Sequence, residues 1–89
     1  MFRKMIGGKL KFTFRPVDGA HEVFVAGDFT EWKPVRMRRQ EDGHFGISLR
    51  VPLGNHEYKF VVGQEWIPDP DNAEWALNPY GTMNSVAVV

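Results

Sequence analysis

The sequence predicts an all-β fold, an immunoglobulin-like sandwich of two sheets built from about seven short strands. Three observations support this prediction. Apolar and polar residues alternate with a period of two in several segments, turn residues recur about every 8–12 residues, and no segment has a helical period. A small β-barrel of the OB type is the alternative architecture. The 89 residues are enough for one domain.

The first half of the chain predicts three strands. Residues 1–8 are expected to be a flexible arm, either a frayed end or an added edge strand, and residues 9–89 form the domain. Residues 9–14 alternate cleanly and end at Pro16 and at the turn pair Asp18-Gly19. Residues 22–26 are apolar almost throughout, which predicts a central strand covered on both faces. Residues 29–33 form a connector, and residues 35–40 predict a weak strand.

The second half predicts three further strands and one long loop. Residues 44–51 follow the turn signal Glu41-Asp42-Gly43, and residues 56–62 alternate most strictly of all. Gly63-Gln64 then offers a tight reversal. Residues 68–80 contain three prolines and two asparagines and fit no regular element. Residues 83–89 predict a last strand that inserts between two others.

Apolar residues within these strands define the predicted core. Each lies on a face that alternation turns inward, or in a strand that is apolar throughout. The predicted core residues are Phe12, Phe24, Val25, Phe45, Ile47, Leu49, Tyr58, Phe60 and Val86.

Composition excludes several classes of function. Eleven lysines and arginines balance eleven acidic residues, which argues against a nucleic-acid partner because such partners select a basic protein. The absence of cysteine excludes disulfides, thiol catalysis and cysteine-based metal sites. No segment resembles a signal peptide or a membrane span, so we expect no membrane partner and a cytoplasmic location.

The tryptophans give the strongest functional signal. All three, and Tyr80 with them, lie in or beside turns, whereas core aromatic residues usually lie within strands. Alternation and the reversal at residues 63–64 would place Lys59 and Trp66 on one exposed surface. An indole can cover the apolar face of a sugar while an ammonium donates to its hydroxyls. From the residues alone, a binding surface and a structural role for these rings remain equal alternatives.

Metal binding and catalysis have weaker support. The three histidines show no metal-ligand spacing, and no cofactor motif is present. Asp69, Asp71 and Asn72 raise the alternative of a calcium site, but the EF-hand pattern is absent. A glycoside hydrolase would need a carboxylate pair, for which Asp28 with Glu31 or Glu41 are the candidates. Because each of these acids lies in a turn, we expect a domain without catalytic activity.

Two long stretches resemble a known family. Residues 23–32, VFVAGDFTEW, resemble the V-F-x-x-G-x-F-N-x-W stretch of the glycogen-binding domain in the β subunit of AMP-activated protein kinase. Residues 52–60, PLGNHEYKF, are similar to its P-x-G-x-H-x-Y-K-F stretch. Residues 63–66, 69–70 and 81–84 continue the match in order, so the resemblance covers about residues 20–89. The same module, carbohydrate-binding module family 48, forms the early-set domain of isoamylases and glycogen branching enzymes.

The resemblance implies an immunoglobulin-like sandwich that binds α-1,4-linked glucan on one surface. It implies two stacking platforms, a lysine that donates to sugar hydroxyls, and two residues of the last loop that hydrogen-bond the glucan. Tyr80 stands where the kinase module has a leucine that presses on the sugar. By position, the implied site residues are Trp32, Lys59, Trp66, Tyr80, Thr82 and Asn84.

The sequence also departs from the family pattern. Thr30 stands where many members have asparagine, which raises the question of how the turn before Trp32 is closed. The resemblance assigns no role to Trp75, which is either a third platform, a lid or an anchor for its loop. Three readings remain: a glucan-binding module that acts through a protein partner, an oligomer or the polymer alone, a protein-interaction domain that pairs by an edge strand, and a small hydrolase.

Overall fold

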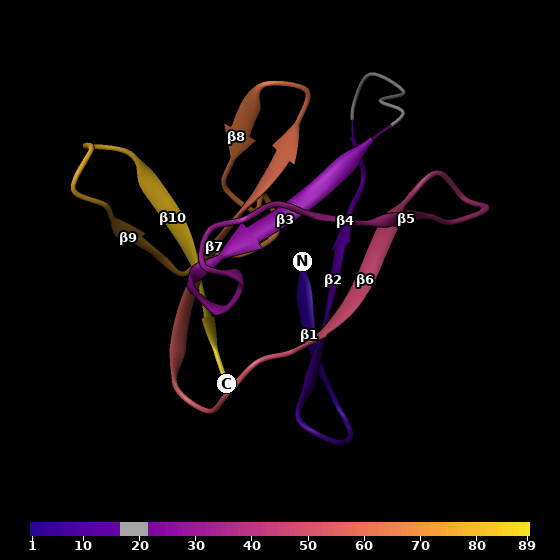
Figure 1. Cartoon of the computed structure of the whole chain (residues 1–89), viewed down its shortest axis with the longest axis horizontal. Helices are drawn as coiled ribbons and strands as arrows, with labels where there is room; N and C mark the ends of the chain where they lie inside the picture. The colour runs from indigo at the N-terminus through magenta and orange to yellow at the C-terminus, as the bar shows by residue number, and fades with distance from the viewer. Residues whose placement is uncertain (17–21) are drawn as a thin grey trace.

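The computed structural model describes residues 1–16 and 22–89, whose strands form two antiparallel sheets (Figure 1). The four-stranded sheet has the order β1-β2-β6-β5. Its strands are β1 (Phe2–Met5), β2 (Lys9–Phe14), β6 (Phe45–Arg50) and β5 (Arg38–Arg39). The predicted turn at Asp18-Gly19 lies outside the described residues.

The second sheet has six strands and the order β4-β3-β7-β10-β9, with β8 paired to β7. Its strands are β4 (Val35–Arg36), β3 (Val23–Gly27), β7 (Asn55–Val62), β8 (Glu65–Ile67), β9 (Trp75–Leu77) and β10 (Met83–Val88). A single 3-10 turn, η1 (Asp28–Thr30), follows β3. Two separate sheets packed on a common core confirm the sandwich and exclude the closed barrel.

The structure corrects two predictions about the strands and decides between the alternatives of a third. The weak strand over residues 35–40 is two short strands, β4 and β5, which belong to different sheets on either side of buried Met37. The loop predicted over residues 68–80 contains β9, which pairs with β10. Of the two alternatives for residues 1–8, the structure has the edge strand, because β1 pairs with β2. As predicted, β10 lies between two other strands, β7 and β9.

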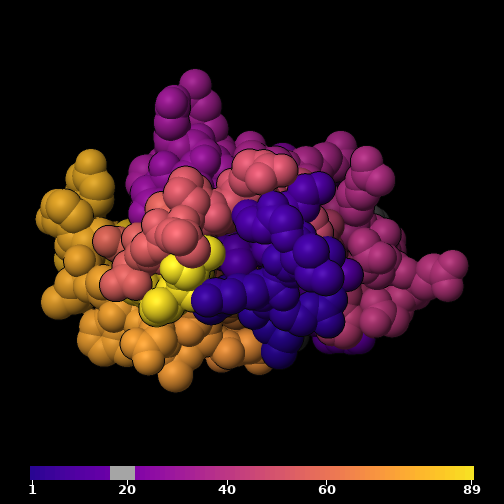
Figure 2. Space-filling model, turned by 90° about the horizontal axis from the view of Figure 1, so that it is seen from below, coloured from indigo at the N-terminus to yellow at the C-terminus, as the bar shows by residue number. Residues whose placement is uncertain are grey.

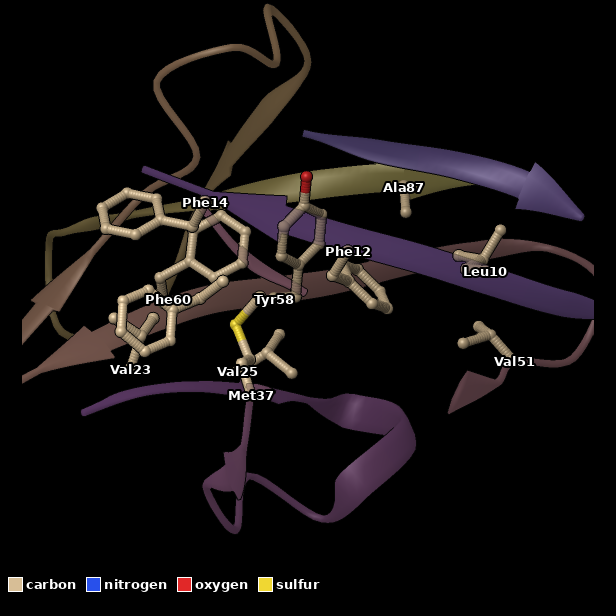
Figure 3. Packing of buried hydrophobic residues seen from close by; sticks show 11 residues of the cluster. Leu10, Phe12, Phe14, Val23, Val25, Met37, Val51, Tyr58, Phe60 and Ala87 are labelled. Atoms are coloured by element: carbon tan, nitrogen blue, oxygen red, sulfur yellow. The ribbon is translucent and has the colours of Figure 1, made fainter. Parts of the chain in front are cut away.

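The core lies between the sheets and is rich in aromatic rings (Figure 3). Phe12, Tyr58 and Phe60 are completely buried, and the rings of Phe12 and Tyr58 meet edge to face at 5.1 Å between centroids. Burying side chains of this size removes 150–250 Å² of each from water, which makes them the main source of stability. The buried core is Leu10, Phe12, Phe14, Val23, Val25, Met37, Phe45, Val51, Tyr58, Phe60 and Ala87.

Two predicted core residues point the other way. Phe24 lies opposite Val61 on the outer face of the six-stranded sheet and is only partly buried. Val86 lies opposite Glu57 on the same face, and its neighbour Ala87 is buried in its place. Both strands are apolar on two faces, so alternation alone could not assign the inner one. The predicted residues Ile47 and Leu49 pack against the core but are only partly buried.

Buried hydrogen bonds tie residues 69–72 to the six-stranded sheet. The Tyr58 hydroxyl donates to Asp69 Oδ2 at 2.6 Å, and the Asp69 N–H donates to Ser85 Oγ at 2.6 Å. Asn72 Nδ2 donates to the Tyr58 oxygen at 3.0 Å. Burial, and then the Asp69 carboxylate, raises the pKa of the Tyr58 hydroxyl above its usual value. Asp69 and Asn72, which raised the calcium alternative, thus have a structural role. Within the described ranges no helix is long and apolar enough to cross a membrane.

Candidate functional site

A hollow of about 580 Å³ lies over the outer face of the six-stranded sheet, beside the β9–β10 hairpin. Its walls come from the segment after η1, from β7 and β8, and from the β9–β10 turn. The hollow brings together all six site residues that the resemblance implies. The lining residues are Asp28, Trp32, Glu57, Lys59, Trp66, Leu77, Asn78, Pro79, Tyr80, Thr82 and Asn84.

Two indoles form exposed walls of this hollow. Trp66 is 44% exposed and lies opposite Val61, whose side chain belongs to the outer face of β7. Trp32 is 37% exposed and follows η1. Neither ring is in the core, as the prediction requires. The lining also includes one cation, Lys59, and two acids, so the hollow has mixed charge and suits an uncharged ligand rich in hydroxyls.

The backbone that carries Trp32 is strained. Glu31 and Trp32 both have left-handed φ angles, 57° and 58°, which residues other than glycine rarely adopt. Such a conformation costs on the order of 1–3 kcal/mol and persists only where neighbours hold it. The N–H of Trp32 donates to the Gly27 carbonyl at 2.8 Å, which closes the turn and turns the indole outward.

This turn is held in place by three residues that precede Trp32 in the chain: Gly27, Phe29 and Thr30. A Cβ on Gly27 would lie 2.5 Å from the Phe29 ring and 2.7 Å from the Glu57 carbonyl oxygen, so only glycine fits there. The Thr30 hydroxyl donates to the Gly27 carbonyl and accepts from the Gly27 N–H, each at 3.0 Å. Phe29 stacks on core Phe12 with centroids 5.4 Å apart. Thr30, a departure from the family pattern, therefore closes the turn itself.

Asp28 fastens the same turn to β7. Its Oδ2 accepts from the Glu57 N–H at 2.9 Å, and its Oδ1 accepts from His56 Nδ1 at 2.7 Å. Both carboxylate oxygens are thus occupied within the protein. This gives Asp28 a positioning role, and it gives His56 one as well, where sequence reasoning had assigned neither.

The prediction that Lys59 is exposed was wrong. Its side chain is only 7% exposed, and Nζ donates to Thr82 Oγ1 at 3.0 Å. Asn78 Nδ2 donates to the same oxygen at 2.6 Å. Because two donors fill the lone pairs of the Thr82 oxygen, its hydroxyl hydrogen is left to donate to a ligand. Lys59 still lines the hollow and keeps further N–H donors.

Asn84 is also more enclosed than a ligand-contacting residue needs to be. It is 6% exposed, its Oδ1 accepts from Asn78 Nδ2 at 3.2 Å, and its Nδ2 donates to Glu57 Oε1 at 2.9 Å. The geometry therefore gives Asn84 a bracing role beneath the hollow, with one amide hydrogen to spare.

Sequence reasoning missed Asn78, which organises the β9–β10 turn. Its Oδ1 accepts from the N–H groups of Tyr80 and Thr82 at 3.0 and 3.1 Å. This turn presents Tyr80 at 91% exposure. The signal was present in the sequence, because Asn78-Pro79-Tyr80-Gly81 has the residues that a type I turn favours at its first, second and fourth positions.

Trp75 does not belong to the hollow. It lies on β9 opposite Ser85, whose side chain is buried on the inner face of the sheet. Asn84, the neighbour of Ser85, points to the outer face, so Trp75 points away from the side that carries the hollow. At 55% exposure it is neither a third platform within this hollow nor a lid over it.

The fold and the site together define a β-sandwich module with an open hollow lined by two indoles. The family described as "Glycogen recognition site of AMP-activated protein kinase" matches residues 10–89. The chain belongs to this family, which confirms the resemblance and the prediction of a non-catalytic domain.

Similar proteins agree with this assignment. The chain is 33% identical over 76 residues to the 5'-AMP-activated protein kinase subunit beta-1 of Sus scrofa, and the match covers 85% of the chain and 61% of that protein. The human subunit beta-1 is also 33% identical, with 27% of its length covered. The chain thus spans only part of these relatives. Among solved structures, a maltogenic amylase from S. marinus matches with a TM-score of 0.77 and 26% identity, over 91% of this chain and 13% of that one.

Proposed function

We propose that the chain binds α-1,4-linked glucan, as in glycogen, starch or maltooligosaccharides, in the hollow on the six-stranded sheet. The single observation that carries the proposal is the convergence of two half-exposed indoles with a hydrogen-bonding network in one open hollow. Trp32 and Trp66 stack on the apolar faces of glucose rings. Tyr80 lines the hollow from the β9–β10 turn and offers a further ring to the sugar.

The polar part of the site is built before the ligand arrives. Lys59, Asn78 and Thr82 hold one another, so the Thr82 hydroxyl and the free Lys59 hydrogens have set directions. The strained turn likewise holds Trp32 in place. Preorganisation of this kind reduces the entropy lost on binding, which matters for a weak ligand such as a sugar.

The test is titration of the full chain with maltoheptaose, followed by the chemical shifts of the indole N–H groups. We expect saturable shifts of the Trp32 and Trp66 signals and an unchanged Trp75 signal, which serves as an internal control. Cellohexaose, a β-1,4-linked glucan of different curvature, should leave all three unchanged. If maltoheptaose moves no indole signal, the proposal is wrong, and the protein-interaction reading takes its place.

A further inference from the structure

Basic residues are concentrated on one sheet of this electrically neutral chain. The four strands of the β1-β2-β6-β5 sheet carry seven of the eleven lysines and arginines and no acidic residue. These seven are Arg3, Lys4, Lys9, Lys11, Arg38, Arg39 and Arg50. The acids among residues 1–16 and 22–89 all lie outside these four strands, in the other sheet, in η1 or in loops.

The strand register places five of the seven on the outer face of this sheet. Leu10 and Phe12 point into the core, so Lys9 and Lys11 point outward. Their cross-strand neighbours share that face: Arg3 lies opposite Lys11, and Arg50 lies opposite Lys9. We call the surface formed by Arg3, Lys9, Lys11, Arg38 and Arg50 the basic face. Arg38 belongs to it because it pairs with Gly46, which lies opposite outward-facing Thr13.

The charges of the basic face are not neutralised within the protein. Among residues 1–16 and 22–89, the ion pairs within 4.0 Å include none of its five members. Arg50 donates to the Gly7 carbonyl, which leaves its charge in place. Cross-strand neighbours lie about 5 Å apart and next-nearest residues along a strand about 7 Å apart, so these cations repel one another. An anionic partner would relieve this repulsion.

Apolar side chains protrude beside the basic face. Ile6, in the turn between β1 and β2, is fully exposed, and Met5 next to it is 41% exposed. Lys9 follows Ile6 after the two glycines Gly7 and Gly8, so cations flank this apolar tip. Figure 2, the view from below, shows the N-terminal strands on the surface of this end of the molecule. A fully solvated isoleucine contributes nothing to folding.

We propose that the basic face and Ile6 dock on a membrane surface that contains anionic lipids. At the usual strand spacing and rise per residue the face spans about 20 by 20 Å, roughly half of the 800 Å² per partner that a stable protein interface needs. A lipid surface needs no such area, because each cation contributes separately and an apolar tip inserts among the headgroups. The exposed side chains of the face include no aromatic ring on which the bases of a single-stranded nucleic acid would stack.

This contact leaves the hollow free. The two sheets turn their outer faces in opposite directions, so a docked molecule presents the hollow away from the membrane. The expectation of no membrane partner rested on the absence of an apolar span, and a surface contact needs no span.

The test is sedimentation of the full chain with vesicles of phosphatidylcholine, with and without about one third phosphatidylserine. We expect binding only to the anionic vesicles, weakening as salt rises towards about 0.15 M. The double variant Lys9→Gln, Lys11→Gln should bind roughly 30-fold more weakly. The matched variant Lys33→Gln, Arg36→Gln removes the same charge outside the face, where each cation lies 3.8 Å from a carboxylate, and should bind as the wild type does.

Three results would overturn the proposal: no binding to anionic vesicles at low salt, equal binding to both vesicles, or equal loss in the two double variants. Binding of polyglutamate without binding of phosphatidylserine would also overturn it and would assign the face to an acidic protein. Maltoheptaose binding by the double variant Lys9→Gln, Lys11→Gln shows whether that variant is folded. Failure of the vesicle experiment would leave the glucan proposal unaffected.

Discussion

Replacing Trp66 with alanine tests the stacking account most directly. Trp66 is 44% exposed, which leaves on the order of 100 Å² of its surface open to solvent. Covering that area with a sugar stabilises the complex by about 2.5 kcal/mol, at about 25 cal/mol per Å². Its loss should therefore weaken glucan binding roughly 70-fold.

The affinity of the wild type sets what can be measured. Two indoles contribute about 5 kcal/mol, and two or three hydrogen bonds add about 1 kcal/mol each. Immobilising the ligand costs about 4 kcal/mol or more. The net is about −4 kcal/mol, near a millimolar Kd for a short oligosaccharide. Trp66→Ala should therefore bind too weakly to detect.

Affinity electrophoresis in gels that contain glycogen gives the readout, because many chain ends amplify weak binding. The wild type should be retarded and Trp66→Ala should not. Trp75→Ala is the matched control, since it removes a similarly exposed indole outside the hollow, and it should be retarded like the wild type. Retardation of Trp66→Ala equal to that of the wild type, in a variant with an unchanged melting temperature, would refute the stacking account.

Three further predictions follow from the core and the turn. Phe60→Ala should lower the free energy of unfolding by about 3–5 kcal/mol in urea titrations, because a completely buried ring is lost; a loss below about 1 kcal/mol would contradict this. Because burial raises the pKa of Tyr58, the unfolded state loses the hydroxyl proton first. Stability should then fall by about 1.4 kcal/mol per pH unit above about pH 10, a slope that Tyr58→Phe should lack. Asn78→Ala, which releases the Thr82 hydroxyl, should weaken maltoheptaose binding roughly fivefold to tenfold; unchanged binding would show that the turn does not position Thr82.

The alternation of residues determined the strands that have one buried face. Residues 9–14 and 56–62 were placed correctly because their inner and outer sides differ in polarity. Phe24 and Val86 were misplaced because their strands are apolar on both sides, so only pairing with the neighbouring strand decides which side faces the core. The short strand β9 was missed because three residues carry too little pattern to be detected.

The composition of the hollow was also accessible from the sequence, since family motifs named six residues that the fold brings together. Which of them are free to meet a ligand was decided only by the tertiary structure. Lys59 is buried beneath Thr82 because a hairpin distant in sequence closes over it, and Asn84 braces Glu57 for the same reason. The basic face likewise arises only when strands from three parts of the chain pair. The net charge of the sequence is zero and does not show that folding gathers cations on one sheet.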